Sequence, residues 1–326
     1  MKPTLSDIAR EANVSVSTVS QALRGKGTVA KETKDRILRV ARELGYNRKT
    51  SKDELRIGVI AQTSSFTESE VYKQYFAGIK HELGDALHLV ATVESDLFPI
   101  DTITNGFADL DGIIFFGGEE EHPSIKHIID QTDLKIIMIN RYTDNERIST
   151  VCTNNFEAYY EVTTHLIKHH CYKNFAFACQ EPIKSWARKR FQGHQTAVER
   201  HLEEGQTVLL SAPRRKEIVK LLLELDSWPD ALLAESDGVA CYIMESIQSQ
   251  GIKVPEDIAI VGCDDLPVSR NSTPRLSTIN TSPRRLGETA ARLLKEVIYN
   301  GYCSAHITIP ARPIYRGSCG CSDGAD

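Results

Sequence analysis

The chain has 326 residues, of which 41% are hydrophobic and 25% are charged. This composition excludes a disordered chain, and the length predicts two or three folded units. No apolar run approaches the roughly 18 residues that a transmembrane helix needs, and the opening MKPTLSDIAR lacks the apolar run of a signal peptide. We therefore expect a soluble protein located in the cytoplasm.

The net charge of -5 is unevenly distributed along the chain. Residues 1–56 contain 13 Lys and Arg against 7 Asp and Glu, whereas residues 57–326 contain 26 against 37. Clustered Lys and Arg side chains attract phosphate groups. The charge pattern predicts a polyanionic partner for the amino-terminal segment and a different ligand for the remainder.

Three short helices are expected in the first 46 residues. Thr4 and Asp7 have capping-box spacing, Ser15 is a suitable N-cap for a second helix over 16–23, and a third helix follows Val29. Two short helices joined by a few residues are typical of a helix-turn-helix whose second helix enters the DNA major groove, although any small helical subdomain has such pairs. The outward face of the second helix is polar, with Ser17, Ser20, Gln21 and Arg24.

From Arg56 onward, apolar segments that predict strands alternate with segments that predict helices. We expect strands at 57–61, 87–93, 112–116, 135–139, 175–179, 207–210, 231–234 and 258–263. Helices are expected near 70–84, 123–131, 155–170, 187–203, 214–224 and 236–250. This alternation predicts an α/β core of two parallel sheets covered by helices, with ligands bound at the carboxyl ends of the strands, in a cleft between two lobes.

Common catalytic signatures do not occur in this sequence. The patterns GxGxxG, GxxxxGK[ST], HExxH and GxSxG, which mark dinucleotide, P-loop, zincin and hydrolase sites, are all missing. We therefore expect no enzyme activity and no cofactor.

The eight cysteines lie mostly in apolar runs and are expected to be reduced core residues. Cys319 and Cys321 have a spacing that suits a metal, but no second pair or histidine stands near them in the sequence. His165 and His169 have the spacing of an amphipathic helix surface. We predict no metal site.

Two polar positions are candidates for ligand recognition. Asp264 follows an apolar strand, where its carboxylate can accept two hydroxyl hydrogen bonds from a sugar or polyol, although an Asp pair also suits a turn. Arg190 stands three residues before Gly193 and can pair with an anionic or hydroxylated ligand, although an isolated Arg is usually a surface residue.

The segments TLSDIAREANVSVSTVSQAL, VPEDIAIVGCDD and PRLSTIN, with the RxxG of residues 190–193, resemble the lac repressor (LacI/GalR) family of bacterial transcription regulators over essentially the whole chain. The resemblance implies an all-α helix-turn-helix head at 1–46, a hinge at 47–56 and a two-lobed core at 57–326 like periplasmic binding proteins of type I. The amino-terminal lobe is expected at 57–152 plus 281–302, and the carboxyl-terminal lobe at 155–278 plus 306–326.

The resemblance also assigns contacts with DNA. Val16, Ser17 and Gln21 stand where the family reads bases, and the expected phosphate contacts are Thr4, Ser15, Thr18 and Ser20. Arg24, on the same polar face, is also expected to bind DNA. Gln21 stands where members commonly carry Arg. Because Gln pairs with adenine and Arg with guanine, we expect an A·T preference at that base pair.

On the effector side, Asp264 and Arg190 match the family's ligand-binding carboxylate and arginine. Asn154 stands where many members carry Asp, and Ser236 lies at a strand-end ligand position. The expected stacking walls are Trp186 and Phe116. This combination suits a sugar or a nucleoside.

The linker departs from the family pattern, because it is more than a helical turn shorter than the usual hinge and lacks its Pro and Ala-Arg pair. We expect its basic residues to contact phosphates instead of wedging into the minor groove; these are Arg48, Lys49 and Lys52.

The predicted function is a homodimeric, operator-binding regulator, expected to be a repressor, whose DNA affinity depends on a small molecule bound between the lobes. Two alternatives stay open at this stage. One is a regulator of the same fold controlled by a partner protein on the 66–80 helix, and the other is a two-lobed α/β enzyme.

Overall fold

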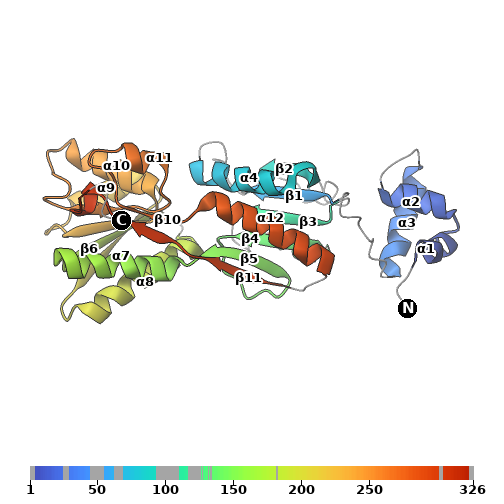
Figure 1. Ribbon diagram of the computed structural model, residues 1–326, viewed down its shortest axis with the longest axis horizontal. Coiled ribbons are helices and arrows are strands. Elements are labelled where there is room, and N and C mark those ends of the chain that lie inside the picture. The colour runs from blue at the N-terminus through green and yellow to red at the C-terminus, as the bar shows by residue number, and fades with distance from the viewer. Residues whose placement is uncertain are drawn as a thin grey trace.

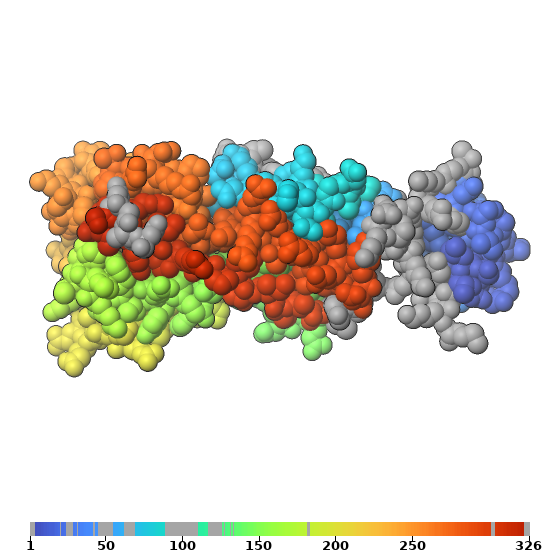
Figure 2. Space-filling view, viewed as in Figure 1, coloured from blue at the N-terminus to red at the C-terminus, as the bar shows by residue number. Residues whose placement is uncertain are grey.

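The computed structural model describes residues 4–24, 29–44, 55–61, 69–92, 110–116, 126, 128–130, 132, 134–180, 183–300 and 304–322. Within these ranges the chain forms a small helical head and two α/β lobes (Figure 1). The head lies at the end of the amino-terminal lobe that faces away from the carboxyl-terminal lobe (Figure 2). The expected contacts of Arg48, Lys49 and Lys52 lie outside the described residues. No helix in these ranges is long and apolar enough to cross a membrane.

The head consists of α1 (Leu5–Glu11), α2 (Val16–Arg24) and α3 (Lys31–Glu43). Thr4 and Asp7 form the predicted capping box: the Asp7 N–H donates to Thr4 Oγ1, and the Thr4 N–H donates to Asp7 Oδ2 at 2.9 Å. The apolar side chains that recur with helical spacing meet in one small core. That core contains Ile8, Ala9, Ala12, Val19, Ala22, Ile37, Val40 and Ala41.

The amino-terminal lobe is a six-stranded parallel sheet in the order β11-β5-β4-β3-β1-β2. The strands are β1 (Ile57–Ala61), β2 (Leu87–Thr92), β3 (Gly112–Phe116), β4 (Lys135–Ile139), β5 (Ile148–Thr153) and β11 (His306–Ile309). The short η1 (Gly84–Ala86) precedes β2. Helices α4 (Glu70–Leu83) and α12 (Pro283–Asn300) pack on one face of the sheet, where they form its larger apolar core.

The carboxyl-terminal lobe is a four-stranded parallel sheet in the order β7-β6-β8-β9. Its strands are β6 (Asn174–Gln180), β7 (Gln206–Ala212), β8 (Ala231–Ala234) and β9 (Ala259–Val261). Helices α7 (Asn155–His170) and α8 (Ser185–His201) share one apolar core with this sheet, and α9 (Arg215–Leu223) and α10 (Asp237–Gln248) share another. Successive strand residues point to opposite faces, so each strand contributes to both cores.

The remaining elements join the lobes or finish the chain. They are α11 (Pro267–Asn271), β10 (Thr278–Asn280), β12 (Arg312–Ile314) and η2 (Gly317–Cys319), with β10 and β12 paired antiparallel. The chain passes between the lobes after β5, after β10 and after β11 (Figure 1).

The position of β11 corrects one expected boundary. The sequence pattern places residues 306–309 in the carboxyl-terminal lobe, but they form the edge strand of the amino-terminal sheet, parallel to β5. The physical reason is that the chain returns to β5 after α12. There the Thr150 N–H donates to the Ala305 carbonyl at 2.9 Å. The chain enters the other lobe only after Ile309.

Both sheets reverse their strand order at one point. In the amino-terminal lobe β1 lies between β2 and β3, and in the carboxyl-terminal lobe β6 lies between β7 and β8. Ligands of open α/β sheets bind outside the carboxyl ends of the strands at such reversals. Phe116 ends β3 and Glu235 follows β8, so both lie at these positions.

Candidate effector site and nucleic-acid interface

The outer face of α2 carries the residues expected to read bases. Val16, Ser17 and Gln21 are exposed, and Val16 keeps 45% of its surface in contact with solvent. The opposite face of the helix, with Val19 and Ala22, is buried in the head. An exposed valine at the start of a helix lends itself to contact with a thymine methyl group in the major groove.

Three hydroxyl groups gather at the amino-terminal end of α2. Ser15 Oγ accepts the Thr18 N–H at 3.0 Å and lies 2.7 Å from both Ser17 Oγ and Thr18 Oγ1. A helix amino terminus favours anions, because its free N–H groups and its dipole are positive. The predicted phosphate contacts Ser15 and Thr18 therefore share one end of the helix. Ser20 and Arg24 belong to α2, but their side chains lie outside the described part of the structure.

Arg190 is the centre of the predicted effector site. It lies on α8, is only 2% exposed, and donates hydrogen bonds to the Glu235 carbonyl and, at 2.8 Å, to Asn155 Oδ1. The guanidinium carbon stands 4.6 Å from the centre of the Trp186 ring, within cation–π range. These contacts hold a buried positive charge in a fixed orientation.

Asp264 faces this arginine across the site. Its Oδ1 lies 3.5 Å from Arg190 Nη2 and accepts the Thr281 hydroxyl at 3.2 Å. Burial raises the pKa of the Asp264 carboxyl, and Arg190 opposes that shift. The structure thus brings together two residues that the sequence analysis singles out separately, at a distance of 3.5 Å that leaves ligand groups able to compete for both side chains.

The two predicted stacking residues, Trp186 and Phe116, differ in their exposure to solvent. Trp186 is partly exposed beside Arg190. Phe116 is fully buried, with its ring centre 5.3 Å from that of Tyr72 and 5.6 Å from that of Tyr75. Burial, with the nearby Asp264 carboxylate, raises the pKa of Tyr75. Phe116 is therefore packed against tyrosines of α4 in this conformation.

Asn154 and Ser236 have local backbone partners. Asn154 Oδ1 accepts the Ala311 N–H at 2.5 Å and so joins two of the passages between the lobes. Ser236 is the N-cap of α10, and its Oγ accepts the Val239 N–H at 3.3 Å. Among the described residues, neither side chain forms a hydrogen bond with Arg190 or Asp264.

Asn155 and Glu235 are site residues that the sequence pattern did not reveal. Asn155 Nδ2 donates to Asn140 Oδ1 at 3.0 Å, so its amide connects the end of β4 to Arg190. Burial raises the pKa of Glu235 to about 7, and its Oε1 accepts the Gln180 N–H at 3.0 Å. Both residues follow the end of a strand, and this position is the signal by which the sequence could have indicated them. The strand before Asn155, β5, is not predicted by the sequence pattern.

A separate cavity of about 1100 Å³ lies beside β10 and β12. Asp265 in its wall pairs with Arg270 at 2.6 Å and with Arg316 at 2.7 Å, so this second aspartate anchors the carboxyl-terminal tail. None of the predicted effector residues lines this cavity. Buried polar groups from several strand ends converge instead around Arg190 and Asp264.

A helix-turn-helix head with an exposed polar face, joined to two parallel-sheet lobes with buried polar groups between them, defines a DNA-binding regulator with a sensory domain. Residues 4–49 match the family described as bacterial regulatory proteins, lacI family, and residues 163–319 match the periplasmic binding protein-like domain. The chain belongs to the lacI family of DNA-binding transcriptional repressors.

Individual relatives agree with this assignment. The HTH-type transcriptional repressor PurR of Pasteurella multocida (strain Pm70) is 28% identical over 316 residues, which cover 90% of this chain and 92% of that protein. Among solved structures, a CelR–cellobiose complex has a TM-score of 0.70 at 20% identity, with 97% and 100% of the two chains covered. A lac repressor dimer bound to operator and the anti-inducer ONPF has a TM-score of 0.71 at 21% identity, with 98% and 99% covered. The relatives are transcriptional regulators, not enzymes.

Proposed function

We propose that this repressor binds a hydroxylated small molecule, of the sugar or nucleoside class, between its lobes and changes its operator affinity in response. The observation that carries the proposal is the buried Arg190–Asp264 pair, separated by 3.5 Å. Arginine only donates hydrogen bonds and an ionised carboxylate only accepts them. A ligand with hydroxyl groups satisfies both, because each hydroxyl donates and accepts.

The connections between the lobes support a coupling to DNA binding. Asp264 in the carboxyl-terminal lobe holds Thr281 beside the start of α12, and Asn155 holds Asn140 at the end of β4. A ligand that replaces one of these contacts changes the relative stability of two lobe arrangements by its differential affinity for them. The cellobiose of the CelR complex is a ligand of the proposed class in a protein of similar fold.

On the DNA side, we propose that Val16, Ser17 and Gln21 contact bases, and that Thr4, Ser15 and Thr18 contact phosphates. Their exposure on the head and the clustered hydroxyls at the start of α2 support this assignment. Ser20 is assigned to the DNA backbone by the family pattern alone, Arg24 to DNA by its place on the polar face of α2, and the linker residues Arg48 and Lys49 to phosphates by their charge.

We further propose a homodimer, as in the lac repressor dimer bound to operator. Large apolar side chains remain exposed on the carboxyl-terminal lobe, including Val208 and Leu209, each at 40%, on the edge strand β7. An open strand edge with exposed apolar side chains is a surface that proteins normally cover. Two copies related by a twofold axis place two recognition helices on a near-palindromic operator.

A ligand screen tests the proposal directly. The purified chain is heated with sugars, sugar phosphates, nucleosides and purines, since a ligand at 100 times its Kd adds about 2.7 kcal/mol of stability. We expect at least one compound to raise the Tm of the wild type and not that of Asp264→Asn, and to change operator affinity. A panel without any such compound contradicts the small-molecule proposal and favours control by a partner protein.

A further inference from the structure

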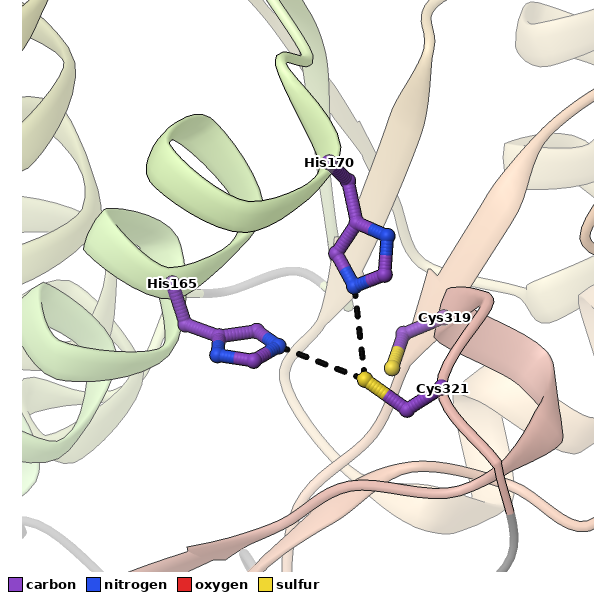
Figure 3. A group of neighbouring side chains, drawn as sticks. All are labelled: His165, His170, Cys319 and Cys321. Atoms are coloured by element: carbon purple, nitrogen blue, oxygen red, sulfur yellow. Dashed lines mark hydrogen bonds between the residues drawn. The ribbon is translucent and has the colours of Figure 1, made fainter. Parts of the chain in front are cut away.

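Four metal-ligating side chains meet on the carboxyl-terminal lobe, away from the effector site. They are His165 and His170 from α7, and Cys319 and Cys321 from the tail of the chain (Figure 3). One donor atom from each residue can be chosen so that all four lie within 4.8 Å of one another. The Nε2 atoms of both histidines lie 3.3 Å from Cys321 Sγ.

These distances approach those of a tetrahedral zinc site. Zinc binds imidazole nitrogen at about 2.0–2.1 Å and thiolate sulfur at about 2.3 Å, so the edges of such a tetrahedron are about 3.3–3.8 Å long. The nitrogen–sulfur edge of such a tetrahedron is about 3.6 Å long, and the two observed distances of 3.3 Å lie within a few tenths of an ångström of it. In Figure 3 both imidazoles point to Cys321 Sγ and the Cys319 sulfur lies next to it, within the 4.8 Å limit of the cluster.

The fold builds this cluster from two pairs of residues, and each histidine stands more than 150 positions before Cys321 in the sequence. His170 is the last residue of α7, and η2 brings Cys319 beneath it. Gly320 has a φ of +93°, which favours glycine, and a Cβ there would lie 3.3 Å from the His170 ring. The glycine therefore allows the tail to turn so that both cysteines reach the histidines.

Neighbouring rings fix the two imidazoles. Tyr315 stacks on His165 with ring centres 3.7 Å apart, and Tyr172 stacks on His170 at 5.3 Å. The Tyr172 hydroxyl also donates to the Cys319 carbonyl at 3.4 Å. Ligands held by a surrounding shell of this kind keep the orientation that a metal requires.

The tail is also fastened independently of the cluster. Ser318 Oγ donates to the Ile260 carbonyl at 2.6 Å and accepts the Ser277 N–H at 2.8 Å. In the space-filling view the carboxyl-terminal segment, in red, lies against α7, in green (Figure 2). The cluster thus lies where the residues after β12 contact α7.

We propose that His165, His170, Cys319 and Cys321 bind one Zn²⁺ ion, which fastens the carboxyl-terminal tail to α7. Two thiolates and two imidazoles are a donor set that selects zinc over the hard cations Mg²⁺ and Ca²⁺. Four protein ligands complete a tetrahedron and leave no position for substrate, so the site is structural. The proposal does not depend on the effector or the operator.

Metal content is the first test. The full chain is purified without a histidine tag, with a non-chelating reductant, and its zinc is measured by mass spectrometry. We expect one zinc per chain in the wild type, and loss of at least nine-tenths of it in Cys321→Ser. The control is Cys171→Ser, an exposed cysteine next to His170 that lies outside the cluster, which should keep its zinc.

Cobalt provides a second, spectroscopic readout. After zinc removal by a chelator, Co²⁺ is added to the reduced wild type, and we expect the intense visible bands of a tetrahedral ion together with thiolate charge-transfer absorption. The chelator should lower the Tm of the wild type, and zinc should restore it. Neither addition should move the Tm of Cys321→Ser.

Three results would overturn the proposal. The reduced wild type takes up neither zinc nor cobalt; or zinc is present in equal amounts in the wild type and Cys321→Ser; or peptide mapping of protein purified under reductant finds Cys319 and Cys321 joined in a disulfide. In the last case the two cysteines form a redox pair and not a metal site.

Discussion

The Nε of Arg190 donates a 2.8 Å hydrogen bond to Oδ1 of Asn155. Because arginine can only donate, this bond fixes the orientation of the asparagine amide and turns its Nδ2 toward Asn140 Oδ1 and the Tyr142 hydroxyl, at 3.0 and 3.2 Å. Arg190 belongs to the carboxyl-terminal lobe, and Asn140 follows β4 of the other lobe. One buried amide therefore connects the proposed effector arginine to both lobes.

Replacement of Asn155 by Ala should destabilise the protein. It leaves the buried Nε of Arg190 without the Asn155 acceptor, whereas Asn140 Oδ1 keeps the Thr153 N–H at 3.4 Å. A buried polar group that loses its partner costs about 1–3 kcal/mol. We expect a lower Tm, measured by thermal unfolding, and weaker binding of any ligand found in the screen. Asn271→Ala is the control, because Asn271 is exposed at the end of α11. Equal Tm values for the two variants would contradict this role of Asn155.

Gly193 should not tolerate a side chain. It lies in α8 where the helix crosses α7, and a Cβ built on it stands 2.1 Å from the Phe156 carbonyl oxygen. The backbone must move to relieve this overlap, so Gly193→Ala should lower the free energy of unfolding by about 1–3 kcal/mol or more. The movement should also shift Arg190, which lies one turn earlier in the same helix. Gly238→Ala in α10 is the matched control, since its nearest atom is 3.7 Å away and alanine favours helix by up to about 1 kcal/mol. Tm measurements should separate the two variants in opposite directions.

Much of the fold could be predicted from local patterns. The three helices of the head and the eight expected strands are present, with ends shifted by up to two residues. β5 was missed because half of its residues are polar, yet all six are buried. Ser149 Oγ accepts the Ala305 N–H at 3.0 Å and Thr150 Oγ1 lies 2.9 Å from His306 Nδ1. These partners belong to β11 and the residue before it, which lie 156 positions later in the chain. A local sequence pattern therefore cannot indicate that the polar residues of β5 are buried.

The residues of the two proposed sites also differ in how far the sequence reveals them. Arg190 and Asp264 could be singled out from the sequence, the first by its RxxG motif and the second by its place after an apolar strand. Their ion pair could not, because it joins a helix residue to a strand-end residue 74 positions away. The zinc-ligand cluster could not be predicted, since two of the three histidines of α7 meet the two cysteines only after the tail folds back across the lobe. Asn155 was hidden by the missed strand that precedes it.

The stability of the protein should depend on pH through Glu235. Burial raises its pKa to about 7, above the usual value of about 4.3 for glutamate. The stabilising contribution of the protonated form is complete below the usual value and is lost as the pH rises through 7. Glu235→Gln removes this loss, so its Tm should match that of the wild type at pH 4.5 and exceed it at pH 8, by an amount corresponding to about 1–3 kcal/mol. The exposed Glu204→Gln should show no such pH-dependent difference.

The exposed edge of β7 should be needed for dimerisation. Leu209→Glu places a charge on the proposed interface, and burial of an unpaired charge is unfavourable. We expect at least a tenfold weaker dimer in sedimentation equilibrium, with far-ultraviolet circular dichroism unchanged. Gln206→Glu on the same strand adds the same charge at an exposed polar position and should weaken the dimer less. If both variants remain as dimeric as the wild type, β7 lies outside the interface.

Gln21 should set the base preference at one position of the operator. It is exposed on α2, where a glutamine amide can donate to N7 and accept from N6 of adenine, whereas an arginine donates twice to guanine. Selection from random DNA should therefore enrich A·T at one position of each half-site for the wild type, and G·C at the same position for Gln21→Arg. Each good bidentate pair is worth about 1–3 kcal/mol of discrimination, which is roughly a 5- to 150-fold difference in competition binding. Thr18→Ala, which removes a proposed phosphate contact, should weaken binding to all sequences alike and leave the selected base unchanged. Guanine enriched by the wild type would show that Gln21 does not read this base pair.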